Sequence, residues 1–329
     1  MYLYRCNICG KEFKDWIDGT YKRIPRCPNC FPIKKSAIEY ELFYYISNDL
    51  NIKCIQNDRY LLKDKELDIY IPEKNIAFEL DGLYWHRYER IGKDYHLNKT
   101  LACQEKGIQL IHIFEDEWYF KRDIIKSKIK HILGLNDNPK IYARKCYIKE
   151  VNNKIKSNFL EFNHIQGNDK SILNLGLYYK NELISIMTFS SLRKALGQQS
   201  KKGFYELSRF AIDTNYQVPG AFSKLFKYFV DNYEFNEIIT YADRRWSIGN
   251  LYEKCGFKLD HISKPNYWYI RGKNSGRQRM HRYQFRKSKL EKLFPDIYDD
   301  NKTEYKIMLE AGFFKIYDCG NLVYKYINL

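Results

Sequence analysis

The sequence predicts an α/β protein made of several folded parts, and three patterns support this fold class. Residues 36–134 read as helix, two strands, helix, strand and helix, which describes a compact α/β domain. A second series of strands and helices begins at Ile141, after the short polar segment Leu135–Pro139. Two Cys-x-x-Cys pairs precede both series. The predicted parts are residues 1–33, 34–138, 139–290 and 291–329.

Composition favours a folded protein that binds a polyanion. Of the 329 residues, 44% are hydrophobic and 17% are aromatic, which is typical of packed cores rather than of disorder. The formal net charge of +16 indicates nucleic acid or a membrane surface as partner. Apolar runs stay well short of the roughly 20 residues that span a bilayer, and the first residues lack the apolar region of a signal peptide. Nucleic acid is therefore the expected partner.

Four cysteines have the spacing of a zinc site. Cys6 and Cys9 form one Cys-x-x-Cys pair, and Cys27 and Cys30 form the second. Tetrahedral Zn²⁺ takes four thiolates, and a segment of about 30 residues cannot bury enough core to fold without such a staple. We therefore expect a structural Zn²⁺ and a zinc ribbon over residues 1–33. The five other cysteines are scattered, which suits a reducing compartment better than a disulfide framework.

The first helix is expected from Ser36 to Leu50, and its Glu39 has two interpretations. Ser36 followed by Glu39 three residues later is a capping-box signature. Alternatively, Glu39 reaches toward the acidic hairpin that follows in the sequence. The sequence alone leaves both interpretations open.

Two strands, Glu66–Ile71 and Ile76–Asp81, are predicted to form a hairpin through the turn Pro72–Asn75. If Ile71 pairs with Ile76, side-chain alternation gathers carboxylates on one face and apolar residues on the other. The acidic face holds Glu66, Asp68, Glu79 and Asp81, and the core face holds Leu67, Ile69, Ile71, Ile76, Phe78 and Leu80. Like charges directly opposite destabilise a hairpin, so the pattern predicts a divalent cation. We expect Mg²⁺ on Asp68 and Asp81; a solvated acidic face is the alternative.

The residues that follow the hairpin can supply acid–base groups. His86 lies five residues beyond Asp81 and is the expected proton donor or acceptor. Asp94, His96 and Lys99 lie near the start of the next helix, where His96 and Lys99 share a face. With Mg²⁺, such groups can provide the activated water, the charge stabilisation and the proton that phosphodiester hydrolysis needs. The predicted catalytic residues are Glu39, Asp68, Glu79, Asp81, His86, Asp94, His96 and Lys99.

Three further elements complete the first domain. A helix is expected over Lys93–Glu105, a buried strand over Gln109–Phe114 and a helix over Asp116–Leu133. His112 lies inside the apolar strand and is expected to be structural.

Several motifs of this domain resemble a known nuclease family. They are Asp68, Phe78-Glu-Leu-Asp81-Gly82-Leu-Tyr-Trp85-His86, Lys93-Asp94-Tyr-His96-Leu-Asn-Lys99 and the run from Gly107 to Trp118. Together they resemble the very-short-patch-repair branch of the PD-(D/E)xK nucleases, and more closely the phage and intron homing endonucleases with an EDxHD motif. The resemblance implies a restriction-endonuclease-like core, a mixed sheet flanked by helices, with Mg²⁺ dependence and cleavage of double-stranded DNA.

The resemblance also implies roles by position. Asp68 would be the central metal ligand, Glu39 the acid carried by the helix, His86 the catalytic histidine and Asp94 the closing acid. Asp81 stands where the repair enzymes carry a histidine. The lysine of the wider superfamily is absent from Glu79-Leu80-Asp81, which favours a histidine mechanism.

The second domain shows a different resemblance. Strands are expected at Leu173–Tyr179, Leu183–Ser190, Glu206–Ala211 and Glu237–Tyr241, with helices at Ala221–Tyr233 and after Asn250. The segments Glu206–Ile212, Gln217–Leu225 and Asn250–Phe257 resemble GNAT-type acetyltransferases. That family cradles a cofactor pyrophosphate on backbone amides at the start of a helix. Gln217 and Gly220 fit its motif, but Phe222 stands where a small residue belongs, so we expect a GNAT-like fold that contacts DNA phosphate instead of acetyl-CoA.

Basic residues interleaved with aromatic ones are the expected DNA contacts. The run comprises Arg271, Lys273, Arg277, Arg279, Arg282, Arg286, Lys287 and Lys289, with Tyr269, Tyr283 and Phe285 between them. Arg244 and Arg245 form a second candidate. Such runs are often solvated faces, but aromatics between arginines suit backbone contact with stacking. The tail, residues 291–329, is expected to end in a hairpin around Asp318–Asn321.

Together these patterns predict a metal-dependent, site-specific DNA endonuclease of the phage homing type. Its expected cofactors are catalytic Mg²⁺ and structural Zn²⁺, its partner is double-stranded DNA, and its expected location is the cytoplasm, of a bacterial host if the chain is phage-encoded. The alternatives are a mismatch-directed nicking endonuclease, and an acetyltransferase or DNA-binding protein with a decayed nuclease domain.

Overall fold

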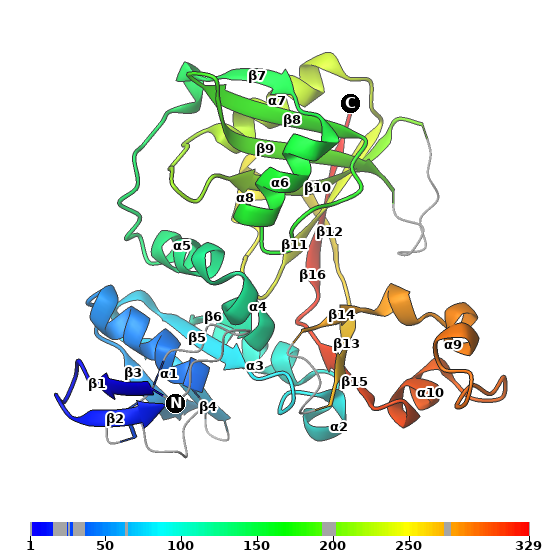
Figure 1. Ribbon diagram of the computed structural model, residues 1–329. Coiled ribbons are helices and arrows are strands. Elements are labelled where there is room, and N and C mark those ends of the chain that lie inside the picture. The colour runs from blue at the N-terminus through cyan, green and yellow to red at the C-terminus, as the bar shows by residue number, and fades with distance from the viewer. Residues whose placement is uncertain are drawn as a thin grey trace.

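The computed structural model describes residues 2–15, 25, 27–28, 37–62, 65–192, 202–272 and 278–328. Figure 1 shows the first α/β domain in the lower part of the molecule and a large sheet in the upper part. The strands form sheets of two, four, seven and three strands. None of the described helices is long and apolar enough to cross a membrane.

The N-terminal segment is a small antiparallel ribbon. Strand β1 (Tyr2–Arg5) pairs with β2 (Glu12–Asp15). Cys6 lies in the turn between the two strands, where its backbone amide donates a hydrogen bond to the Lys11 carbonyl at 2.8 Å.

The first domain is built on the four-stranded sheet β3-β4-β5-β6. Its strands are β3 (Ile55–Leu62), β4 (Lys65–Ile71), β5 (Ile76–Asp81) and β6 (Gln109–Phe114). Ile71 pairs with Ile76 across an antiparallel hairpin, which confirms the predicted register. The connection to β6 runs through α2 (Tyr88–Ile91) and α3 (Tyr95–Gln104), so β6 lies parallel to β5.

The two faces of the β4–β5 hairpin are largely as predicted. Most of the apolar face packs in one core with α1 (Ala37–Tyr44), which continues into a π-helical turn, η1 (Tyr45–Asp49). Leu67 is the exception, since it packs with Tyr70 and Ala77 on the opposite side. An irregularity in the β3–β4 pairing lies beside it. The acidic face is covered rather than solvated, because every residue of β5 is buried.

Two predicted features of the first domain are corrected. Glu66 leaves the acidic face for β3, where it forms an ion pair with Arg59 at 2.5 Å. The single helix expected over Asp116–Leu133 is two helices, α4 (Glu115–Phe120) and α5 (Arg122–Ile132). Lys121 between them adopts φ −129° and ψ 29°, which is outside helical geometry.

The seven-stranded sheet has the order β12-β16-β11-β10-β9-β8-β7. The strands run β7 (Tyr147–Glu150), β8 (Leu173–Tyr179), β9 (Glu182–Ser191), β10 (Phe204–Ile212), β11 (Glu237–Asp243) and β12 (Lys258–Ile262). The helical segments are η3 (Ala143–Lys145), α6 (Asn153–Asn163), α7 (Ala221–Asn232) and α8 (Asn250–Lys254). Among the described strands of this sheet, β10 and β11 are the pair that runs parallel. The predicted strands and helices of this domain are confirmed within one or two residues.

The predicted C-terminal hairpin is wrong, because the last two strands belong to different sheets. Strand β15 (Phe313–Tyr317) joins β13 (Tyr267–Arg271) and β14 (Met280–His281) in a three-stranded sheet. Strand β16 (Asn321–Ile327) lies between β11 and β12 in the large sheet, and Figure 1 shows it rising from the lower part into the upper part. The residues between β14 and β15 form η5 (Arg282–Phe285), α9 (Lys287–Leu293) and α10 (Glu304–Glu310).

A buried ion-pair network joins these units. Glu117 of α4 forms two ion pairs. Its carboxylate is 2.9 Å from Arg245, which follows β11, and 2.7 Å from Arg279, which precedes β14. Arg279 also pairs with Asp116 at 2.9 Å, and Arg245 pairs with Asp243 at 2.7 Å. The first domain, the large sheet and the three-stranded sheet therefore meet at one glutamate.

Replacement of Glu117 should unfold this junction. In Glu117→Ala two buried guanidinium groups lose their shared carboxylate, and removal of one partner of a buried pair costs about 3–5 kcal/mol. We expect a loss of that size in urea unfolding. Asp231→Ala, which removes the exposed pair with Lys227 on α7, should change stability by less than about 1 kcal/mol. Equal losses in the two variants would contradict the assigned role of the junction.

Candidate metal centre

Asp81, the last residue of β5, lies at the centre of three imidazole rings. Its Oδ1 is 3.1 Å from His86 Nδ1 and 3.4 Å from His96 Nε2, and its Oδ2 is 3.0 Å from His112 Nδ1. His86 follows the turn after β5, His96 lies in the first turn of α3, and His112 lies on β6. Because β6 runs parallel to β5 with Glu79 opposite His112, that ring shares the face of the carboxylates.

Three of these atoms have the separations of metal ligands. The third edge of the triangle, from His86 Nδ1 to His96 Nε2, measures 2.9 Å. Ligands about 2.0–2.2 Å from one ion, at tetrahedral or octahedral angles, lie roughly 2.9–3.5 Å apart. Asp81 Oδ1 is buried and makes no hydrogen bond, which leaves it available to an ion. Asp81, His86 and His96 therefore fit a divalent cation.

The rings hold Asp81 ionised and leave His112 neutral. Burial alone would raise the pKa of Asp81, but His96, His112 and His86 hold it well below its usual value. Burial lowers the pKa of His112 to about 4, although Asp81 opposes this shift. A neutral imidazole keeps one nitrogen as a donor, and a carboxylate accepts only, so Nδ1 of His112 carries the proton that Asp81 receives.

A second group of charges lies farther back along the strands. Lys99 of α3 pairs with Glu79 at 2.5 Å, and Asp68 accepts the Leu80 amide at 2.8 Å. Burial, together with Glu79 and Glu39, raises the pKa of Asp68 well above its usual value. Glu39 thus lies close enough to act on Asp68, which favours its reach toward the hairpin; its predicted cap partner, Ser36, lies outside the described residues.

The predicted site residues fall into three groups. Asp81, His86 and His96 come together with His112, which the sequence placed among structural residues. Glu39, Asp68, Glu79 and Lys99 form the second cluster, which adjoins the first because Asp81 acts on Glu79. The shared Mg²⁺ on Asp68 and Asp81 stays a prediction. Asp94 is exposed at the N-cap of α3.

Three of the predicted zinc ligands also come together. Their ligand atoms lie within 4.8 Å of one another, and Cys9 Sγ is 3.6 Å from Cys27 Sγ. Thiolates about 2.3 Å from a tetrahedral ion are about 3.8 Å apart, so Cys6, Cys9 and Cys27 fit Zn²⁺. Cys30 lies outside the described residues.

The predicted DNA contacts divide into buried and exposed arginines. Arg245 is buried and Arg279 is half-buried in the junction network, where both form ion pairs within the protein. The guanidinium carbon of Arg279 lies 4.0 Å from the Phe114 ring centre. Arg244 and Arg282 are half-buried. Arg271 and Arg286 are exposed, and Arg286 lies 4.5 Å from the ring centre of Tyr283. Arg277 lies outside the described residues.

The turn before α7 is covered by the chain itself. Gln217 donates its side-chain amide to the carbonyls of Asn136 and Asn138 at 2.8 and 2.9 Å. The Ala143 amide donates to Pro219 at 3.0 Å, and the predicted domain boundary therefore packs along this turn. The predicted phosphate contact at the start of α7 would have to displace that segment.

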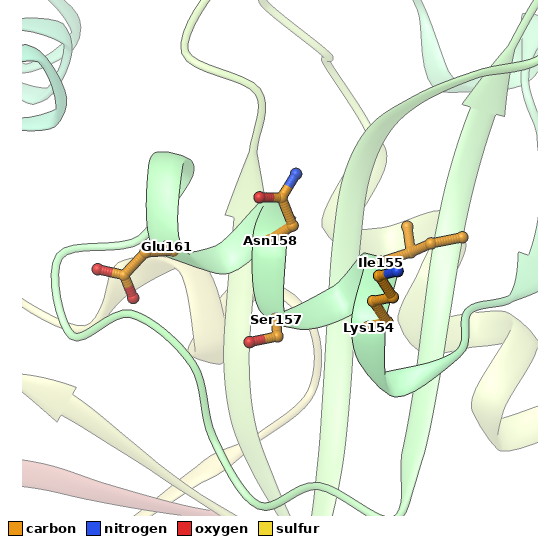
Figure 2. A pocket seen from close by; sticks show the side chains of 5 residues that line it. All are labelled: Lys154, Ile155, Ser157, Asn158 and Glu161. Carbon is orange, nitrogen blue, oxygen red and sulfur yellow. The ribbon is translucent and has the colours of Figure 1, made fainter.

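A shallow surface pocket lies beside α6, away from these clusters in sequence. Figure 2 shows its lining side chains on one helix, pointing in different directions rather than toward a common centre. The residues are Lys154, Ile155, Ser157, Asn158 and Glu161. This pocket is therefore not the candidate site.

Solved structures that resemble the chain include several acetyltransferases. The IAA acetyltransferase from Bacillus cereus ATCC 14579 has 14% identity and a TM-score of 0.32, with 56% of this chain and 99% of that chain covered. A Bacillus subtilis acetyltransferase in complex with CoA has 15% identity and a TM-score of 0.30, with 56% and 100% covered. The ribosomal-protein-S18-alanine N-acetyltransferase from Escherichia coli has 15% identity and a TM-score of 0.30, with 41% and 88% covered. No protein-family model and no curated protein matches the sequence.

These comparisons correct the predicted activity. The similar structures named above are transferases rather than nucleases, so the predicted DNA endonuclease, with its hydrolase class and homing role, finds no support in them and is not retained. The fold prediction holds in its coarser form, a mixed α/β protein with GNAT-like neighbours. Identities of 14–15% and TM-scores of 0.30–0.32 describe a likeness of fold and do not identify a reaction.

The second cluster should make stability depend on pH. Burial raises the pKa of Glu79 from 4.5 to about 7, so the folded chain binds more protons than the unfolded chain between these values. Stability contributed by this group therefore falls as pH rises from 4.5 to 7. Lys99→Met removes the ammonium paired with Glu79 and should steepen this fall, with a loss of about 3–5 kcal/mol at pH 7 and a smaller loss at pH 5. Urea unfolding at both pH values tests it, with exposed Lys254→Met as control; a loss independent of pH would contradict it.

Proposed function

We propose that the chain is a metal-binding protein that binds double-stranded DNA. The observation that carries the proposal is the convergence of Asp81 Oδ1, His86 Nδ1 and His96 Nε2 at separations of 2.9–3.4 Å. Two imidazoles with one carboxylate suit Zn²⁺, Mn²⁺ or Fe²⁺, whereas Mg²⁺ takes oxygen ligands. The ribbon would hold a second, structural Zn²⁺ on Cys6, Cys9, Cys27 and Cys30.

The DNA part of the proposal rests on charge and exposure. The net charge is +16, and the exposed cations include Arg271 of β13, Arg286 between η5 and α9, and Lys289 of α9. Arg286 and Lys289 lie 4.5 and 5.8 Å from the ring centre of Tyr283, whose exposed fraction is 51%. Cations beside an exposed aromatic ring suit phosphate contact combined with stacking. The restriction-endonuclease-like core remains a prediction about the first domain, and the activity attached to it has been corrected above.

Removal of one ligand should abolish tight metal binding at the proposed centre. We expect His96→Ala and Asp81→Asn to lower the affinity for Zn²⁺ and Mn²⁺ by more than about 100-fold in calorimetry, because each variant keeps only two of the three proposed ligands. Asp68→Asn is the matched control, since its carboxyl belongs to the neighbouring cluster. Loss of Mg²⁺ binding in Asp68→Asn with Zn²⁺ binding intact would favour the oxygen-ligand site predicted from the sequence.

The DNA surface is tested by salt-dependent binding. We expect the triple variant Arg271→Ala, Arg286→Ala, Lys289→Ala to bind a duplex more weakly and to lower the slope of log K against log salt by about one per lost phosphate contact. Fluorescence anisotropy over a salt series measures both quantities. Lys254→Ala, an exposed lysine on α8, should leave the slope unchanged. An unchanged slope in the triple variant would remove this surface from the proposal.

A second candidate function is an acetyltransferase, which the structural neighbours support better than a nuclease. The parallel pairing of β10 with β11 ends at Leu207 and Thr240. Beyond Leu207, β10 continues to Ile212 without pairing with β11. Aromatic side chains pack where the two strands stop pairing. Phe222 is 4% exposed, and its ring lies 5.1 Å from that of Phe210 and 5.7 Å from that of Tyr252, both edge-on.

Acetyl-CoA binding distinguishes the two functions. Because bound cofactor would have to displace Phe222 and the segment across Gln217, we expect no saturable heat when acetyl-CoA is titrated into the wild-type chain. Saturable binding would establish the second candidate. Loss of that binding in Gly220→Trp would then place the cofactor at the start of α7.

A further inference from the structure

A buried hydrogen-bonded chain leads from the C-terminal strands to Asp81. Cys319, in the connection between β15 and β16, has its Sγ 3.3 Å from Thr100 Oγ1 of α3. Thr100 Oγ1 is 3.1 Å from His112 Nε2, and His112 Nδ1 is 3.0 Å from Asp81 Oδ2. None of the four side chains belongs to a residue more than 1% exposed.

The protons of this chain can be assigned one by one. Asp81 accepts only, so His112 Nδ1 donates to it and the neutral ring has Nε2 as an acceptor. The Thr100 hydroxyl has one hydrogen and two acceptors in reach, His112 Nε2 and the His96 carbonyl at 2.9 Å. The carbonyl lies within α3, where a backbone amide one turn on can satisfy it, while the buried Nε2 depends on Thr100. The hydroxyl therefore donates to His112, and its oxygen accepts the Cys319 thiol proton.

The consequence is a fixed orientation of the Asp81 carboxylate. Its Oδ2 is held by His112, and its Oδ1 points toward His86 Nδ1 and His96 Nε2. Hydrogen bonds of this kind orient metal ligands, and their loss typically lowers metal affinity about 10–100-fold.

We propose that Thr100, His112 and Cys319 are positioning residues that hold Asp81 for a metal ion, so that the docked C-terminal strands complete the metal site. The inference rests on the proposed metal centre and adds a dependence of that centre on Cys319, which lies 219 residues from Thr100 in the sequence. Metal binding and docking of the β15–β16 connection then stabilise each other, because each fixes the same hydrogen-bonded chain.

Cobalt substitution in the full-length protein tests the inference. Co²⁺ is titrated into the chain after its cysteines have been loaded with Zn²⁺, and the visible absorption that Asp81→Asn removes defines the site. We expect Thr100→Val to weaken this Co²⁺ binding about 10–100-fold and to change the absorption band. Thr100→Ser keeps the hydroxyl and should restore both. Ser185→Ala, which removes a buried hydroxyl bonded to the Ala211 carbonyl at 2.8 Å, is the control for lost stability alone.

The outcomes separate the inference from the function on which it rests. Absence of Co²⁺ absorption in the wild type would overturn the metal centre and the inference together. Wild-type binding with Thr100→Val equal to Ser185→Ala would overturn the inference and leave the metal centre standing. If Thr100→Val fails to fold, Cys319→Ala and Cys319→Ser replace it. We then expect weaker Co²⁺ binding in the alanine variant and near-normal binding in the serine variant, and equal binding in both would overturn the inference.

Discussion

The carboxylate of Glu117 is the constraint on which the arrangement of the three units depends. It lies in α4 of the first domain, yet its partners Arg245 and Arg279 come from the large sheet and the three-stranded sheet. A buried carboxylate without these partners, or either guanidinium without it, would carry a desolvation penalty of several kcal/mol. Docking of the three units therefore satisfies these three buried or half-buried charges at once. This network also explains why Arg245 and Arg279 of a basic chain form ion pairs within the protein.

The same balance of buried charge shapes the candidate metal centre. Strand β5 is buried along its whole length and still carries Glu79 and Asp81. Each is compensated in its own way, Glu79 by the Lys99 ammonium and Asp81 by three imidazoles. Asp81 Oδ1, His86 Nδ1 and His96 Nε2 converge at separations of 2.9–3.4 Å, and a divalent cation can bind all three atoms at once.

Local signals in the sequence predicted most elements, whereas long-range pairing escaped it. The pairing of Ile71 with Ile76 follows from the alternation of apolar and polar side chains and from the short turn, and this register is confirmed. The separation of β15 from β16 could not be predicted locally, because Asp318–Gly320 has the composition of a hairpin turn but connects two sheets. Likewise, the residues around Arg245 and Arg279 do not predict a pairing with Glu117, which lies 128 residues from Arg245 and 162 residues from Arg279.

His112 shows where prediction of the site stopped and what would have extended it. An isolated histidine in an apolar strand is usually structural, and its neighbours Ile111 and Ile113 gave no other signal. The missing step was the parallel alignment of β6 with β5, which sets Glu79 opposite His112 and so places the ring on the carboxylate face. Once that face is known to be covered by α3, a histidine there must bond to something buried, and Asp81 and Thr100 are the groups within reach. The chemistry of the site thus depends on sheet order first and on residue type second.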